Sequence, residues 1–285
     1  MEDKSPSGDT ITFLGTAGAR IMVANQILAS GGLWLSLSGT EILLDPGPGC
    51  IVQSTKRKLR ANKLSAIILS HRHLDHSADT NIMVEAMTQG GLKRHGWFYA
   101  PADALENEPV IFSYLKDYLE GIEILKEGKS YSIGNISFTT PIRHIHSVET
   151  YGMVFSTGEH TFSYIADSRY FDGLCRSYTS ELLIMNVVFL EAGHPFDHLS
   201  VPDAEHIIME LKPKVAILTH FGMTVWRAKP WEVAQRLSEK TGVRVLAARD
   251  GMKFDLSQLG NNRTLESAIC LQLVPLARHA IPPLL

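Results

Sequence analysis

Ile-Ile-Leu-Ser-His-Arg-His-Leu-Asp-His-Ser-Ala-Asp, residues 67–79, is the stretch that decides the fold of this chain. It begins as an apolar run that predicts a buried strand and then turns abruptly polar. Four side chains that can ligate a metal ion follow within six positions: His71, His73, Asp75 and His76. Because burying so many ionisable groups without a cation is costly, we predict that these four residues bind metal.

The composition is that of an ordinary globular protein. The chain has 285 residues, of which 45% are hydrophobic and 20% are charged, and this is enough to bury a large core. It contains no apolar run of membrane-spanning length, and residues 1–9 lack the apolar segment of a signal peptide. We therefore expect a cytoplasmic protein that does not bind a membrane.

Charge and cysteine content argue against two further classes of protein. A net charge of −3 gives no overall attraction to nucleic acid. The three cysteines, Cys50, Cys175 and Cys270, are far apart in the chain and form no CxxC pair. We therefore expect neither a disulfide framework nor a cysteine-based zinc site.

Hydrophobic patterning predicts strands and helices on both sides of the motif. We interpret the glycine-rich stretch 15–18 as a structural turn, because its spacing fits no phosphate-binding motif. Asp45 ends a predicted strand, where it is either a partner of a ligand histidine or a cap of the following loop or helix. The predicted strands are 11–14, 33–37, 41–44, 66–69, 97–101, 136–140, 152–156, 161–166, 182–190, 215–218 and 243–247, and the predicted helices are 50–63, 79–88, 110–119, 202–211 and 230–240.

These elements contain no internal repeat and no low-complexity linker. We predict a single domain over residues 1–255. Residues 256–285 form a C-terminal tail that the sequence does not place on the fold.

The spacing of the motif suits two metal ions better than one. His71 and His73 are two residues apart, so in an extended segment both side chains point toward the same ion. Asp75 and His76 follow where the chain enters a helix, and the change of direction aims them at a second point. Imidazole and carboxylate ligands without cysteine suit zinc, and manganese or iron remain alternatives. We therefore expect two divalent ions, with Zn²⁺ as the first choice and Mn²⁺ or Fe²⁺ as alternatives.

The segment from His71 to His76 resembles the signature of the metallo-β-lactamase-fold hydrolases. That resemblance implies an α/β (α+β) fold, a four-layer αββα sandwich of two mixed sheets with outer helices and a dinuclear site along one edge. It also implies further ligands at later strand ends. By resemblance, one ion is held by His71, His73 and His146, the other by Asp75, His76 and His220, and Asp167 bridges the two. His144 competes with His146, and only the sequence around His146 favours the latter.

Three features of the sequence resemble the ribonuclease Z branch of this family. They are residues 13–19, residues 146–152, and a Glu and a His further along the chain. The pair corresponds here to Glu191, in Leu190-Glu191-Ala192, and His198, in His198-Leu199-Ser200. The branch implies a phosphodiester substrate, either a small molecule or a single strand, and a homodimer. Ribonuclease Z also carries a protruding arm for tRNA, but residues 103–129 contain no such arm and are acidic in places, which argues against tRNA.

The resemblance also implies a mechanism. A hydroxide held between two ions attacks the phosphodiester, Asp75 orients it, and His198 protonates the leaving alkoxide while Glu191 orients His198. The alternative is an ester, thioester or lactone hydrolase that uses the same two-metal site. A non-catalytic binding protein of the same fold is a third hypothesis, but it predicts lost ligands and all seven are present.

Overall fold

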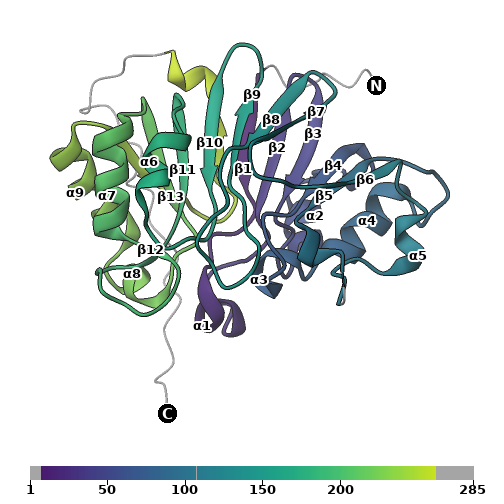
Figure 1. Ribbon diagram of the computed structural model, residues 1–285, viewed down its shortest axis with the longest axis horizontal. Helices are drawn as coiled ribbons and strands as arrows, with labels where there is room; N and C mark the ends of the chain where they lie inside the picture. The colour runs from purple at the N-terminus through teal and green to yellow at the C-terminus, as the bar shows by residue number, and fades with distance from the viewer. Residues whose placement is uncertain (1–7, 107, 261–285) are drawn as a thin grey trace.

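The computed structural model, which describes residues 8–106 and 108–260, has four layers (Figure 1). Two mixed sheets face each other, and helices cover the outer face of each sheet. The covering helices are α6 (Asp172–Ser177), α7 (Val201–Leu211) and α9 (Pro230–Thr241) on one side and α2 (Cys50–Lys56), α4 (Thr80–Thr88) and α5 (Ser113–Lys116) on the other. This arrangement confirms the predicted αββα sandwich.

The first sheet is built mainly from the N-terminal half of the chain. Its strand order is β15 (Lys253–Asp255), β1 (Thr10–Phe13), β2 (Leu33–Leu37), β3 (Thr40–Leu44), β4 (Leu64–Ile68), β5 (Trp97–Ala100) and β6 (Gly121–Ile124). Strands β3 to β6 are parallel to one another, whereas β15, β1, β2 and β3 pair antiparallel.

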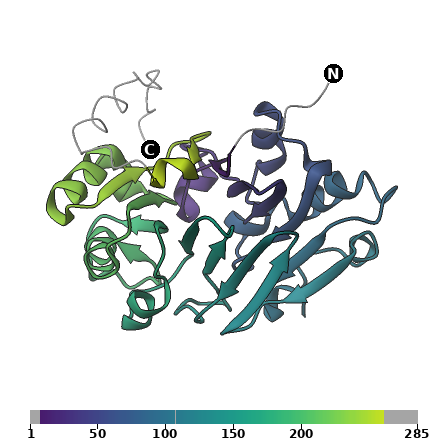
Figure 2. The ribbon, with the colours of Figure 1, turned by 90° about the horizontal axis from the view of Figure 1, so that it is seen from above.

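The second sheet is built from the C-terminal half, which lies beside the N-terminal half when the molecule is seen from above (Figure 2). Its strand order is β14 (Arg244–Ala247), β13 (Val215–Thr219), β11 (Leu182–Phe189), β10 (Thr161–Ile165), β9 (Met153–Ser156), β8 (Ile136–Thr140) and β7 (Lys129–Ile133), and the short β12 (Leu199–Ser200) pairs with β11. Strands β10, β11, β13 and β14 are parallel, so their carboxyl ends meet at one edge.

Three apolar clusters hold the four layers together. The largest lies between the sheets and includes Phe138, Phe155 and Phe162, whose rings stack one on the next. The other two lie between each sheet and its helices. Strand β11 is buried from Leu182 to Val188 because it is covered on both faces, and this explains its continuous apolar run.

Two predicted helices are shorter in the structure. The helix predicted over 50–63 ends at Lys56, since Lys58 adopts φ +58° and the chain continues as a 3₁₀ turn, η1 (Ala61–Lys63). Of the helix predicted over 110–119, only the short helix α5 forms. Its expected first residues are held by a side chain instead, because Asn81 accepts from the Phe112 N–H and donates to the Val110 carbonyl.

Several short elements were not predicted at all. Among them are α1 (Ala19–Ala24), α6, α8 (Met223–Arg227), β6, β7, β12 and β15. Strand β6 owes its conformation to pairing along the edge of β5. The predicted tail begins with another 3₁₀ turn, η3 (Leu256–Leu259), whose Leu256 and Leu259 pack into the cluster between the sheets. Its remainder, residues 261–285, lies outside the described residues. Within the described chain, no helix has the length and apolar character needed to cross a membrane.

Candidate metal centre

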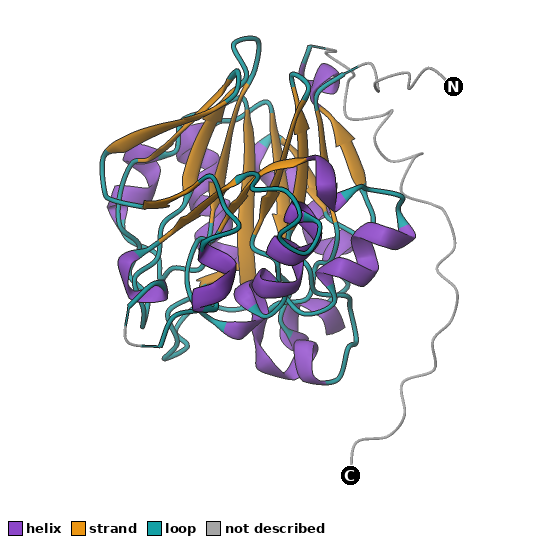
Figure 3. Cartoon of the chain, turned by 90° about the vertical axis from the view of Figure 1, so that its right-hand side faces the viewer, coloured by secondary structure: helices purple, strands orange, loops and turns teal. Residues whose placement is uncertain are grey.

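The predicted ligands lie in loops and in one short helix that follow the ends of strands. Short helices and loops gather at one edge of the two sheets (Figure 3). His71 and His73 follow the end of β4, and Asp75 and His76 lie in the one-turn helix α3 (Leu74–Ser77). The other ligands follow later strands: His146 lies between β8 and β9, Asp167 after β10 and His220 after β13. Because β4, β10 and β13 belong to parallel sets, their carboxyl ends bring residues far apart in the chain to this edge.

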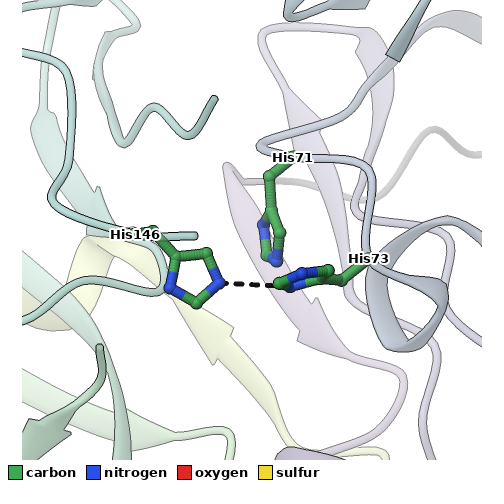
Figure 4. Close-up of side chains that lie close together, drawn as sticks. All are labelled: His71, His73 and His146. Carbon is green, nitrogen blue, oxygen red and sulfur yellow. Dashed lines mark hydrogen bonds between the residues drawn. The ribbon is translucent and has the colours of Figure 1, made fainter. Parts of the chain in front are cut away.

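His71, His73 and His146 form the first group of candidate ligands (Figure 4). Their ring centroids are 4.8 Å apart for His71 and His73, 5.1 Å for His71 and His146 and 4.9 Å for His73 and His146. The Nε2 atom of His146 is 3.1 Å from the Nδ1 atom of His73. Three imidazoles therefore converge on one point from two separate loops.

Asp75, His76, Asp167 and His220 form the second group. The Nε2 atom of His220 is 3.4 Å from the Asp75 carboxylate, and that of His76 is 3.4 Å from Asp167. The Asp167 carboxylate faces both groups, since its Oδ2 atom is also 3.8 Å from the Nε2 atom of His71. Asp167 thus lies where a ligand shared by two ions is expected.

Unpartnered ring nitrogens show that this residue set fits metal ions. The Nε2 atoms of His71 and His76 and both ring nitrogens of His220 are buried without a hydrogen-bond partner among the described residues. Buried polar atoms are otherwise nearly always paired. Imidazole nitrogens and carboxylate oxygens around a shared point are the donor set that zinc and similar divalent ions prefer.

The electrostatics of the site hold His71 and Asp167 in the protonation states that ligation requires, and they concentrate negative charge around His76. Burial lowers the pKa of His71 well below its usual value, with the neighbouring His76 acting in the same direction, so His71 is neutral. Burial alone would raise the pKa of Asp167, but His220, His198 and His76 outweigh it and hold that pKa well below normal. Burial would lower the pKa of His76, yet the carboxylates of Asp167, Asp75 and Asp45 raise it well above normal. The carboxylates therefore attract positive charge to the centre, which bound cations would supply.

Asp45 orients the ring of His76 through its Nδ1 atom. Its Oδ2 atom is 3.0 Å from the Nδ1 atom of His76 and also accepts from the hydroxyls of Ser70 and Tyr164, while its Oδ1 atom accepts from the Ser70 N–H. Of the two roles left open by the sequence, the structure therefore supports the partner of a candidate ligand. Asp45 holds a left-handed conformation, φ +54°, which is typical of a functional site.

His220 is also held in a left-handed conformation, φ +58°, and the 15–18 turn holds it there. The Phe221 N–H donates to the Thr16 carbonyl and the Gly18 N–H donates to the Phe221 carbonyl. A Cβ atom on Gly18 would lie 2.1 Å from the His220 carbonyl oxygen, so only glycine fits. The glycine-rich turn is structural, as predicted, and it positions a candidate ligand.

His144 and His146, the two competing candidates, differ in the partners of their ring nitrogens. The Nε2 atom of His144 is 2.7 Å from the Tyr178 hydroxyl and its Nδ1 atom is 3.2 Å from the Asp167 carbonyl oxygen, so both ring nitrogens are engaged away from the centre. Burial lowers the pKa of His144 to about 4, which keeps it neutral. His146 instead donates from Nδ1 to the Asp197 carbonyl and leaves Nε2 facing His73.

A model of the beta-lactamase superfamily domain matches residues 40–221. The chain belongs to the metallo-β-lactamase superfamily. An uncharacterized protein of Methanocaldococcus jannaschii is 31% identical over 86% of the chain and 94% of its own length. The probable metallo-hydrolase YhfI of Bacillus subtilis is 28% identical over 74% of the chain and 86% of its own length. These findings make the protein a hydrolase of this superfamily.

Ribonucleases Z are among the relatives, as the sequence motifs predicted. That of Kineococcus radiotolerans is 29% identical over 41% of the chain and 38% of its own length. In three dimensions, the crystal structure of YhfI from Bacillus subtilis superposes with a TM-score of 0.74 and 25% identity, covering 87% of the chain and all of YhfI. The metallo-β-lactamase fold predicted from residues 71–76 is therefore confirmed.

His198 reaches this metallo-β-lactamase centre, but Glu191 does not. The Nδ1 atom of His198 is 3.5 Å from the Asp167 carboxylate, and its ring centroid is 5.2 Å from that of His146. Glu191 is exposed and, among the described residues, makes no hydrogen bond or ion pair. The prediction that Glu191 orients His198 is wrong: β11 ends at Phe189, the Leu190 N–H turns to the Thr224 hydroxyl, and Asp167 faces His198 instead.

One polar residue of the centre escaped the sequence analysis. Asn186 is buried in β11, where its side chain donates to Asp167 Oδ1 at 2.8 Å and to the Tyr164 hydroxyl at 3.1 Å. It therefore fixes the orientation of the carboxylate that faces both groups. A lone amide within the apolar run 182–189 was the only available signal, because a buried amide needs partners.

Proposed function

We propose that this protein is a dinuclear metal-dependent phosphodiesterase. The observation that carries the proposal is the position of the Asp167 carboxylate between two groups of candidate ligands, His71, His73 and His146 on one side and Asp75, His76 and His220 on the other. Zn²⁺ suits this donor set, with Mn²⁺ or Fe²⁺ as alternatives. When bound, two such ions lower the pKa of water and neutralise charge that develops on a phosphoryl oxygen.

The protein's own residues have separate roles in this proposal. Asp75 stays ionised, because although burial would raise its pKa, His76 and His220 lower it well below normal. An ionised carboxylate accepts a hydrogen bond and can thereby orient the attacking water. Asn186 and His220 hold Asp167 in place.

His198 is the proposed proton donor to the leaving oxygen. Its side chain is 18% exposed, so a substrate can reach it, and it lies against Asp167. Burial lowers the pKa of His198 to about 4, although Asp167 acts in the opposite direction. A bound phosphodiester brings a further negative charge next to this ring and thus favours its protonation.

We propose a small or single-stranded phosphodiester as substrate in preference to tRNA. Residues 101–135, of which all but residue 107 are described, form η2 (Ala102–Ala104), α5, β6 and β7. Strand β6 pairs with β5, so part of the interval in which ribonuclease Z carries its arm is an edge of the sheet here.

Hydrolysis of bis(p-nitrophenyl) phosphate by metal-reconstituted protein tests the proposal. We expect activity together with about two ions per chain by elemental analysis. In the single variants His71→Ala and His220→Ala, both the activity and the metal content should fall. Metal-loaded protein that fails to cleave the phosphodiester but cleaves a lactone, ester or thioester would establish the alternative function. One ion or none per chain, unchanged in both variants, would contradict the dinuclear site.

A further inference from the structure

Three aromatic side chains form a stack beside the candidate metal centre, and we call them the aromatic shelf: Phe189, His194 and Phe196. The Phe189 ring lies 3.8 Å from that of His194 at an angle of 25° and 5.9 Å from that of Phe196 at 6°. Phe189 is half-buried at the end of β11, whereas Phe196 is 59% exposed. The aromatic shelf is therefore a set of near-parallel rings that extends from the end of β11 to the surface.

The shelf adjoins the centre itself. The Phe189 ring centroid is 6.1 Å from that of His198, and His198 in turn lies against Asp167. The stretch 190–198 that carries His194 and Phe196 is anchored at its far end, where the Asp197 carbonyl accepts from His146. A phosphodiester bound at the centre would thus have one of its ester groups within reach of the shelf.

A positive charge accompanies the rings. The Arg169 guanidinium pairs with the Asp197 carboxylate at 2.8 Å, yet its side chain remains 56% exposed. Burial lowers the pKa of His194, and the Arg169 charge acts in the same direction, so the imidazole of the shelf is neutral. A guanidinium has five N–H donors and can bind a phosphate oxygen while one of them is used elsewhere.

We infer that the aromatic shelf binds a nucleobase, so that the substrate is a nucleotidyl phosphodiester whose base stacks on Phe196 while Arg169 contacts a phosphate oxygen. The inference rests on the proposed function. Flat aromatic surfaces next to a cation are the combination that recognises nucleotides without base-specific hydrogen bonds, because every base offers a π-face.

Two substrates with the same leaving group test the shelf: the p-nitrophenyl ester of thymidine 5′-monophosphate and methyl p-nitrophenyl phosphate. We expect kcat/KM of the wild type to favour the thymidine ester, and Phe196→Ala to lower this preference about 10- to 100-fold through KM, in line with the loss of one base–aromatic stack. Phe196→Trp should retain the preference. The matched control is Phe112→Ala, which removes an aromatic ring that is 56% exposed and stacked on Tyr114. Phe112 directly precedes α5, which lies on the opposite side of the molecule from β12 (Figure 1).

The outcomes distinguish a failure of the inferred base binding from a failure of the proposed function. Equal cleavage of both substrates by the wild type, or a preference unchanged in Phe196→Ala, would refute base binding by the aromatic shelf. It would leave the proposed phosphodiesterase function unaffected. Failure to cleave either substrate would overturn the proposed function, and calorimetry would then still test the shelf. Uridine 5′-monophosphate should bind more tightly than ribose 5-phosphate to the wild type but not to Phe196→Ala, and equal binding by the wild type would refute the inference.

Discussion

Replacing Asp45 by Asn should weaken metal binding without unfolding the protein. Asn tolerates the left-handed conformation of residue 45 as Asp does, so the backbone gains no strain. The amide oxygen must stay opposite the Ser70 N–H, which requires an acceptor, so the amide nitrogen takes the place of Oδ2. The hydroxyls of Ser70 and Tyr164 can rotate to accept, but the Nδ1 atom of His76 can accept only by losing its proton.

The expected size of the effect follows from this change of tautomer. His76 would then carry its proton on Nε2, the atom that faces Asp167 and Asp75, where it opposes a cation. Changes to a residue that orients a metal ligand typically weaken metal binding about 10- to 100-fold, which corresponds to about 1.4–2.7 kcal/mol. The first group of ligands is affected only indirectly, since the Ser70 hydroxyl that Asp45 holds lies 3.0 Å from the Nδ1 atom of His71, so the loss should be larger for one of the two ions than for the other.

Competition against a fluorescent chelator measures the affinity of each ion, and circular dichroism with thermal unfolding checks the fold. Asp79→Asn is the matched control, since that carboxylate accepts from the Ile51 N–H and, within the described chain, contacts no candidate ligand. If Asp45→Asn binds both ions as tightly as the wild type, the assigned role of Asp45 in orienting His76 is refuted.

Three further predictions concern the support of the centre. Asp250→Ala removes the acceptor of the Thr16 N–H, the Thr16 hydroxyl and the Ala29 N–H, so urea unfolding should show a loss of about 2 kcal/mol; an unchanged midpoint would contradict this. Gly18→Ala brings a Cβ atom to 2.1 Å from the His220 carbonyl oxygen and should reduce the metal content, whereas Gly260→Ala, whose Cβ would lie 3.6 Å from the Ser257 carbonyl oxygen, should not. Removal of metal by a chelator should lower the melting temperature reversibly, because ions that bind only the folded state stabilise it; a melting temperature that does not respond to added Zn²⁺ would count against the centre.

Much of the fold was predictable because its signals are local. Continuous apolar runs identified the buried strands, and the polar residues that end them pointed to the functional edge. Two of the errors fell where a distant residue controls the backbone. Asn81 binds the backbone around α5, and pairing with β5 makes a strand of residues 121–124, although neither partner is adjacent in sequence.

The sequence by itself determined the family and predicted a metal site, since the types and spacing of residues 71–76 are a local property of the chain. The resemblance to the family named His146, Asp167 and His220 as their partners, but only the tertiary structure decided which other distant residues lie beside them. It directs His144 to Tyr178 and His146 to the centre, leaves Glu191 in solvent, and brings Asn186 to Asp167. It also stacks Phe196 on Phe189, whose ring lies beside that of His198. These relations depend on how loops at the ends of strands meet at one edge, and on distances of a few ångströms that spacing along the chain does not encode.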